Sequence, residues 1–231
     1  AGVTVSGSTV TVTAAGTYVL EGTLNGQIVV DAGKDDKIHL VLNGASVTCA
    51  SGAALYVKKA DKVFLTTEAD TQNALVNSGE FVQSDDNNVD GAVFSKSDLT
   101  INGDGTLTVN STAHGIVCKD DLKIMGSTLN ITATKKGIDA NDSVRIAGGS
   151  LTVDSGTDGI HCENTDDTEK GYIYIADGTF TITSGRDAFD ASGTLTVENG
   201  TFTLTTGGGS QTVTVSGGQM MPNDRKPSQD T

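Results

Sequence analysis

The chain has 231 residues, a formal net charge of −14, no tryptophan and only 4% aromatic residues. This charge argues against nucleic acid as a partner, because nucleic-acid binding draws on Lys and Arg to neutralise phosphate. No apolar run approaches the ~20 residues that a membrane span needs. No signal peptide is evident either, so we expect a secreted protein to be present here in its mature form.

The first 35 residues diverge from the rest of the chain, and we expect them to cap one end of the domain. A cap is needed because an open stack of strands leaves backbone groups unpaired at its edge. The segments 36–57 and 62–76 are typical of early, divergent copies of a repeat. The acidic stretch 83–90 follows them, and we predict that it belongs to an inserted loop.

Self-similarity at a fixed period is the strongest pattern in the chain. Four units of 23, 22, 22 and 22 residues occupy 96–118, 119–140, 141–162 and 170–191, with an insertion at 163–169. A partial copy follows at 192–209, and 213–218 begins another. We therefore predict one domain over 1–218, followed by a polar tail or linker at 219–231.

Each unit holds three short stretches with apolar residues at every second position, a spacing typical of strands and not of helices. A propeller is excluded because its blades need about 40 residues. Stacking the units about 4.8 Å apart buries rows that one unit alone could not bury. The pattern predicts an all-β fold, a single-stranded right-handed parallel β-helix with coils of about 22 residues.

The same alignment predicts the state of the cysteines. Cys118 and Cys162 fall in one inward column with Ala140 between them, so they lie two coils apart, roughly 10 Å by the strand spacing. That separation exceeds what a disulfide can bridge. We expect buried free thiols that act as small fillers of a narrow core.

Acidic side chains gather at the third strand of each unit and at the turn after it. Carboxylates on neighbouring coils repel each other unless something neutralises them, and Ca²⁺ accepts six to eight oxygen ligands in flexible geometry. Good turn formation by Asp and Asn and the solubility that charge provides are the alternative explanations. The candidate Ca²⁺ ligands are Asp86, Asp90, Asp120, Asp121, Asp139, Asp142, Asp158, Glu163, Asp187 and Asp190.

The few basic side chains near these acids are candidates for binding a sugar carboxylate together with the metal. They are Lys119, Lys135, Lys136, His161 and Arg186. Simple charge balance for the Asp residues explains each of them equally well. His161, between Asp139 and Asp190 in one column, also fits a hydrogen-bonded member of the acidic row. Tyr56, Tyr172 and Tyr174 are the candidate aromatic platforms for stacking on a sugar.

Several segments resemble a family of secreted clostridial carbohydrate-binding domain-containing proteins with a polysaccharide-lyase-like β-helix. The resemblance covers about 36–210 and lies in DGAVFSKSDLTINGDGTLTVN, HGIVCKDDLKI, KGIDANDSVRIAGG, DGIHCENTDDTEKGYIYIADGTF and GTFTLTTGGGS. It implies a pectate-lyase-like fold, bound Ca²⁺, and affinity for cellulose and acidic pectin-type sugars. It also matches the D-G-I and K-D-D signatures to Asp90, Asp120, Asp121, Asp158 and, in degenerate form, Asp139, Asp142 and Asp187.

We expect a secreted or cell-surface-attached monomer that binds cell-wall polysaccharide with the help of Ca²⁺. The sequence contains no recognisable catalytic motif, so we assign no catalytic residue. One alternative is a calcium-dependent polysaccharide lyase acting by β-elimination, with Arg186, Lys136 or Lys119 as the base. The other alternative is a structural or adhesion module that binds no sugar.

Overall fold

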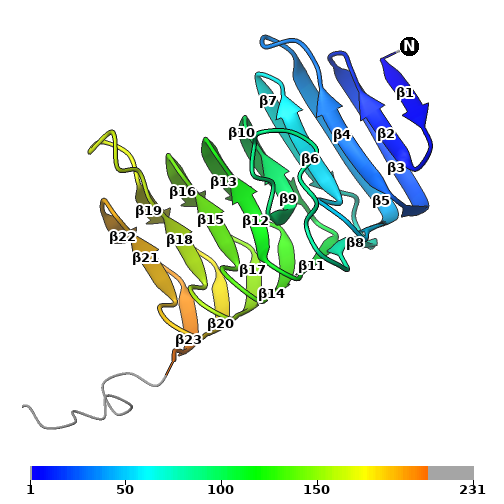
Figure 1. Cartoon of the computed structure of the whole chain (residues 1–231). Coiled ribbons are helices and arrows are strands. Elements are labelled where there is room, and N and C mark those ends of the chain that lie inside the picture. The colour runs from blue at the N-terminus through cyan, green and yellow to red at the C-terminus, as the bar shows by residue number, and fades with distance from the viewer. Residues whose placement is uncertain (1, 208–231) are drawn as a thin grey trace, which may run out of the picture.

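The structure, a computed structural model, describes residues 2–207. This part of the chain consists of strands and turns and holds no helix that could cross a membrane. The strands wind into coils that stack along one axis from the N-terminal end to the last described strand (Figure 1). The predicted parallel β-helix is confirmed. The partial repeat at 213–218 and the tail at 219–231 lie outside the described residues.

The third strands of successive coils form one sheet. Within residues 2–207 this sheet has nine strands, and apart from β1 all of them pair in parallel. In spatial order they are β1 (Val3–Ser6), β2 (Thr9–Val12), β4 (Gln27–Asp31), β6 (Leu55–Lys59), β9 (Gly91–Ser95), β12 (His114–Cys118), β15 (Ile138–Ala140), β18 (Ile160–Cys162) and β21 (Phe189–Ala191).

The first and second strands of the coils form a second sheet of 14 strands within the described residues. The first strands are β7 (Lys62–Thr67), β10 (Asp98–Gly103), β13 (Asp121–Met125), β16 (Ser143–Ile146), β19 (Tyr172–Ile175) and β22 (Leu195–Val197). The second strands are β8 (Gln72–Asn77), β11 (Thr106–Ser111), β14 (Thr128–Ala133), β17 (Ser150–Ser155), β20 (Thr179–Ser184) and β23 (Thr201–Thr205).

The two rows of the second sheet are joined by one long strand near the N-terminal end. Strand β5 (Lys37–Cys49) pairs with β7 through its first half and with β8 through its second half. Strand β3 (Gly16–Asn25) pairs with β5 in parallel and has a register shift between Leu20 and Gly22. At the same end β1 turns back and pairs with β2 in antiparallel fashion.

Like residues lie on top of one another along the stack. Leu99 pairs with Leu122 and Leu122 with Val144, while Ile116 pairs with Ile138. All these side chains are buried in one continuous core, as the aliphatic rows of the sequence predict. The register of the repeat is therefore confirmed.

The cysteines occupy the inward column that the alignment predicts. Cys118 pairs with Ala140 and Ala140 with Cys162. Both thiols are free and buried, and burial raises the pKa of each to about 12. The prediction of buried free thiols is confirmed.

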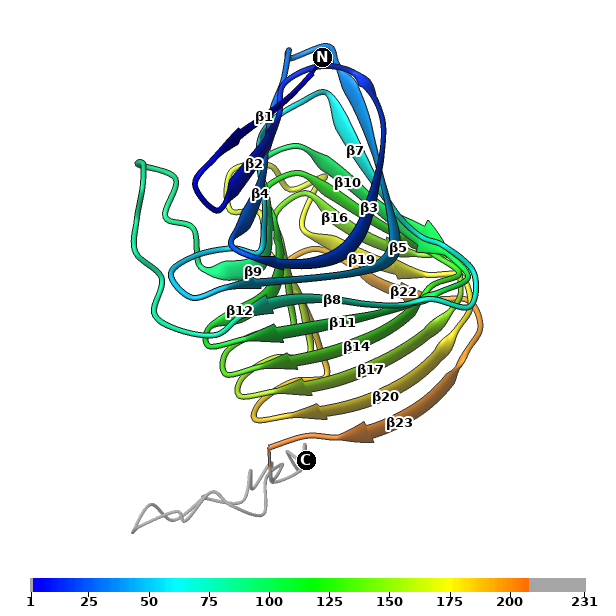
Figure 2. The ribbon, with the colours of Figure 1, turned by 90° about the vertical axis from the view of Figure 1, so that its right-hand side faces the viewer.

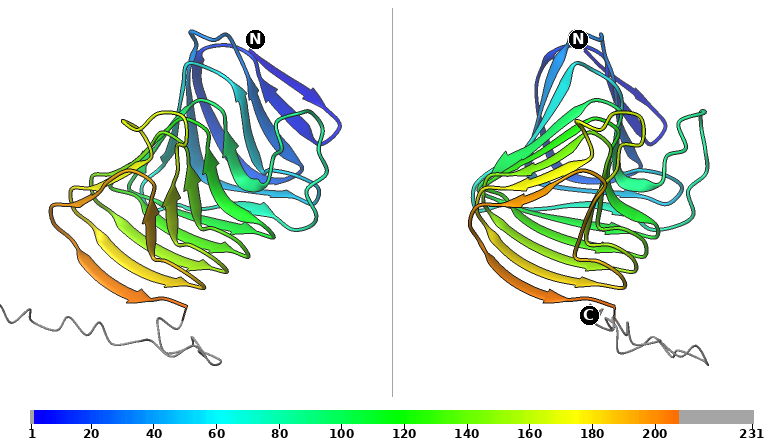
Figure 3. Two further views of the ribbon diagram at one scale, coloured as in Figure 1. Left: turned by 60° about the vertical axis from the view of Figure 1, so that its left-hand side comes forward. Right: turned by 90° about the vertical axis from the view of Figure 1, so that its left-hand side faces the viewer.

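The segment between β8 and β9 leaves the stack and covers part of the outer face of the nine-stranded sheet (Figures 2 and 3). Under it, Tyr56, Phe94 and Val117 are buried together with Val89 of the loop. The Tyr56 hydroxyl donates to Asp85 Oδ2 at 2.9 Å. The expectation that Tyr56 is an exposed sugar platform is wrong, because this loop covers the ring.

Candidate functional site

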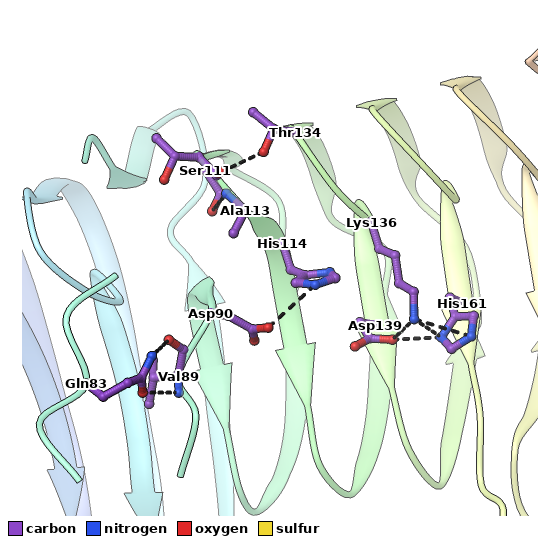
Figure 4. A network of polar contacts seen from close by, with 11 residues as sticks. Gln83, Val89, Asp90, Ser111, Ala113, His114, Thr134, Lys136, Asp139 and His161 are labelled. Atoms are coloured by element: carbon purple, nitrogen blue, oxygen red, sulfur yellow. Dashed lines mark hydrogen bonds and ion pairs between the residues drawn. The ribbon is translucent and has the colours of Figure 1, made fainter. Parts of the chain in front are cut away.

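The outer face of the nine-stranded sheet carries two parallel columns of mostly charged side chains, which we call the outer ladder. Register pairs place Val117, Asp139, His161 and Asp190 in one column. Backbone hydrogen bonds between neighbouring coils align the second column, made of Asp90, His114, Lys136, Asp158 and Asp187. Part of both columns is visible in Figure 4, where the side chains come from successive strands.

At the middle of the outer ladder Lys136 neutralises the carboxylate of Asp139. Lys136 Nζ lies 2.9 Å from Asp139 Oδ1 and 2.9 Å from His161 Nδ1, and His161 Nδ1 lies 2.7 Å from the same oxygen of Asp139. Burial alone would raise the pKa of Asp139, but the hydrogen bonds from His161 and Lys136 hold it below its usual value. The carboxylate in this part of the ladder therefore already has a cationic partner from the protein itself.

The N-terminal part of the outer ladder holds a single loose pair. His114 Nε2 lies 3.5 Å from Asp90 Oδ2, and His114 Nδ1 is buried without a hydrogen-bond partner in the described part of the chain. Burial lowers the pKa of His114 despite the nearby Asp90.

At the C-terminal end three carboxylates meet. Asp158, Asp187 and Asp190 each offer an oxygen, and these atoms lie within 4.8 Å of one another. We call these three residues the acid triad. Asp158 is only 2% exposed, whereas Asp187 is exposed. Among residues 2–207 no Lys or Arg forms an ion pair with the acid triad, and the one basic side chain within 4.0 Å of it is the His161 imidazole, 3.7 Å from Asp190.

The turns after the third strands keep their acids apart from the acid triad. Asp142 accepts hydrogen bonds from Lys170 and Asn164, and Asp121 accepts one from the Ser143 hydroxyl. Burial, together with the charges of Asp98 and Asp142, raises the pKa of Asp120. Asp120 and Asp142 lie within hydrogen-bonding reach of each other, but among the described residues only the acid triad brings three such groups within 4.8 Å.

Two further predicted ligands, Glu163 and Asp86, belong neither to the two columns nor to the acid triad. Glu163 Oε2 is 3.7 Å from His161 Nε2, which places it beside the ladder. Asp86 is exposed on the inserted loop, where its neighbour Asp85 makes the contacts with Tyr56 and, at 3.4 Å, with Lys58. The sequence pattern does not single out Asp85, which lies outside the repeat, or Lys170, which opens the unit 170–191 but whose contact with Asp142 on the preceding coil is not visible in the aligned columns.

Some of the predicted sugar-binding cations contact other groups of the protein, and others are exposed. Lys136 and His161 are bound within the ladder, and Lys119 Nζ lies 5.9 Å above the centre of the Phe94 ring. Lys135 and Arg186 are exposed and form no ion pair within the described range. Arg186 directly precedes Asp187 and is therefore the free cation closest in sequence to the acid triad.

Comparisons with known proteins agree with this architecture. Residues 6–229 match a family described as carbohydrate-binding domain-containing protein. A carbohydrate-binding domain-containing protein of Acetivibrio thermocellus is 40% identical over 129 residues, which are 54% of this chain and 45% of the relative. The matched region thus spans less than half of that relative's length.

A solved structure is similar over most of the chain. The polysaccharide lyase-like protein from C. thermocellum, solved as a gadolinium derivative, is 32% identical and superposes with a TM-score of 0.79. The match covers 87% of this chain and 93% of that chain. The resemblance to a carbohydrate-binding clostridial family with a polysaccharide-lyase-like fold is confirmed.

Proposed function

Because the chain belongs to the family of carbohydrate-binding domain-containing proteins, we propose that it binds acidic polysaccharide outside the cell, without cleaving it, and that Ca²⁺ at the acid triad supports this binding. The observation that carries the proposal is the contrast along the outer ladder. Lys136 neutralises Asp139, whereas the acid triad converges without a lysine or arginine partner in the described residues.

The donor set of the acid triad fits Ca²⁺. All three side chains offer hard carboxylate oxygens, which Ca²⁺ prefers over nitrogen or sulfur ligands. A carboxylate as buried as Asp158 is costly unless it is hydrogen-bonded or paired with a cation, and the backbone N–H of Asp187 reaches its Oδ1 only at 3.4 Å. A bound Ca²⁺ would offset the repulsion between the three carboxylates and leave coordination positions for an oxygen-rich ligand.

Uronate-containing polymers are the ligands that suit such a site. A Ca²⁺ ion held by three carboxylates still accepts further oxygens, and a sugar carboxylate with its neighbouring hydroxyls supplies them. Arg186 is exposed and directly precedes Asp187 in the sequence, and its guanidinium could pair with the same sugar carboxylate in bidentate fashion.

Binding without cleavage fits the state of the candidate bases. Lys136 donates to Asp139 and contacts His161, and Lys119 lies over the Phe94 ring. A general base must be able to give up its proton near working pH. Lys136 and Lys119 are thus engaged with groups of the protein itself and not free to face a substrate.

The metal part is tested by calorimetric titration of Ca²⁺ and by thermal unfolding. Ca²⁺ at about 100 times its Kd is expected to stabilise the protein by about 2.7 kcal/mol, which raises Tm by roughly 5–10 °C at this size. Asp158→Asn together with Asp187→Asn should abolish the shift. The control is Asp154→Asn, since Asp154 is exposed on β17, away from the ladder. An equal shift in the double variant would disprove the site.

A lyase is the second candidate, because Arg186 directly precedes Asp187 of the acid triad and forms no ion pair within residues 2–207. Incubation with polygalacturonate and Ca²⁺ distinguishes the two functions. Steady growth of the unsaturated-uronide absorbance would establish a lyase, whereas co-sedimentation with the polymer and no growth supports a binder. If the protein binds no polysaccharide, the remaining function is that of a structural or adhesion module.

A further inference from the structure

A second surface with binding features lies on the outer side of the first strands. These strands are on another side of the coil from the third strands, as β7, β10 and β16 show in Figure 2. Register pairs align one outward column along them, which we call the first-strand column. It consists of His39, Phe64, Thr100, Lys123, Arg145 and Tyr174.

Two shallow hollows follow this column and share Met125. One, of about 270 Å³, is lined by Lys123, Arg145 and Tyr174 among others. The other, of about 700 Å³, includes His39 and Phe64. The two hollows follow one another across successive coils along the axis of the stack, and we call them together the depression.

The charge in this depression is opposite to that of the whole molecule. Lys123 and Arg145 stand on neighbouring coils as register partners, and neither forms an ion pair within the described residues. Asp121 lies two residues before Lys123 but accepts a hydrogen bond from Ser143. Two adjacent cations that have no ion-pair partner among the described residues repel each other, so they favour an anionic ligand.

Aromatic rings flank the cations on both sides. Tyr174 is the next residue of the column after Arg145, and the carboxylate of Glu198, through a hydrogen bond, raises the pKa of its hydroxyl. On the other side Phe64 packs edge-on against His39, with ring centroids 6.3 Å apart. Half-buried rings offer an apolar face to a ligand while they stay fixed in orientation.

We propose that the first-strand column is a second polysaccharide-binding face, which takes a uronate-containing chain lying along the stack without needing a metal ion. Lys123 and Arg145 bind carboxylates of the sugar chain, and Tyr174 and Phe64 pack against sugar rings on either side. The inference rests on the polysaccharide binding proposed above, but it uses a different face and a different chemistry from the acid triad.

The experiment measures affinity for oligogalacturonate by titration calorimetry, in excess chelator and in Ca²⁺. In chelator, Lys123→Gln with Arg145→Gln should weaken binding at least tenfold, because two charge-assisted contacts are lost. The control with the same change in charge is Lys34→Gln with Lys59→Gln, two exposed lysines away from the column, which should keep the affinity within twofold. Neutral galactan should bind much more weakly than oligogalacturonate.

The outcomes separate the two proposals. If the wild-type protein binds oligogalacturonate only in Ca²⁺, or if the Lys123 and Arg145 variant binds as tightly as the control in chelator, the second face is disproved and the function at the acid triad stands. If the protein binds no polysaccharide under either condition, both fail. Equal affinity for neutral galactan would overturn the role of the cations. Unchanged Tm of each variant shows that folding is intact.

Discussion

At the level of single residues, the outer ladder shows how one substitution in a repeat changes the chemistry of its position. Lys136, Asp158 and Asp187 occupy equivalent places in successive coils. The lysine turns its coil into an internal ion pair with Asp139, while the two aspartates leave a negative cluster with Asp190. The same backbone thus carries a self-neutralised segment and a cation-binding candidate within three coils.

Asp139 should make the stability of the protein sensitive to acid. Its folded pKa lies below the usual value of 3.8, so its contribution is present above about pH 4 and is lost as the pH falls through the folded pKa. Asp139→Asn is expected to cost about 1–3 kcal/mol at pH 7. Urea unfolding at pH 7, 5 and 3 should show the difference from wild type shrinking at the lowest pH. A difference that does not depend on pH would contradict the assignment.

The residues of the outer ladder could be predicted from the sequence, and their roles only in part. Alignment of the coils places Asp139, His161 and Asp190 in one column without any structure. It does not reveal that Lys136 reaches both Asp139 and His161, since side-chain direction depends on local packing. Lys123 and Arg145 are equally periodic, but their significance arises from the hollow around them.

At the level of single elements, a column of glycines lets the third strands approach each other. A Cβ added to Gly137 would lie 2.6 Å from the carbonyl oxygen of Gly159, and one added to Gly115 would lie 2.5 Å from that of Gly137. In the last described coil Ala188 takes the equivalent place, where no further described coil follows. The glycine of the repeat signature is therefore required by coil-to-coil contact.

Gly137→Ala should therefore destabilise the protein by at least about 2 kcal/mol, because the methyl group also meets Val153 at 2.4 Å. Urea unfolding provides the measurement. Ala188→Gly is the matched control, and we expect it to cost only about 0.5–1 kcal/mol through chain flexibility. Similar costs for the two variants would mean that the close approach is relieved by a shift of the backbone.

Strand positions within the regular repeats follow directly from the period-2 pattern, but two elements do not. Strand β5 runs through what would be a turn in later coils, although its segment Lys37–Cys49 holds Asn43 and Gly44 and Gly44 has a φ of 72°. The loop before β9 is recognisable as an insertion, yet its packing on Phe94 and Tyr56 depends on contacts distant in sequence. Contacts of this kind cannot be recognised from the periodic pattern of the sequence.

At the level of the whole molecule, the two ends of the stack formed by residues 2–207 differ. The N-terminal end has β1 folded back in antiparallel pairing. At the other end of the described chain, inward-facing Leu195 and Val197 are 48% and 46% exposed, whereas Leu129 in the middle is fully buried. Each coil of a solenoid is stabilised by its neighbours, so stability should decline toward this end.

Hydrogen exchange should reveal this gradient. Amides of β23 are expected to exchange faster than those of β14 by about two orders of magnitude, because terminal coils open at lower free energy than central ones. Mass spectrometry of peptic fragments resolves the two strands. Equal protection in both would show that the stack opens only as a whole. Repeating the experiment in Ca²⁺ should slow exchange in β18 and β21, which flank the acid triad.

The constant length of the regular units has an evolutionary consequence. Units 119–140 and 141–162 have 22 residues each and share one register, so an in-frame duplication of either would insert a complete coil and leave its neighbours paired. Each such event would lengthen the molecule by about 4.8 Å. Duplications of this kind could thus lengthen the binding surface one coil at a time to match longer polymers, while the fold stays the same.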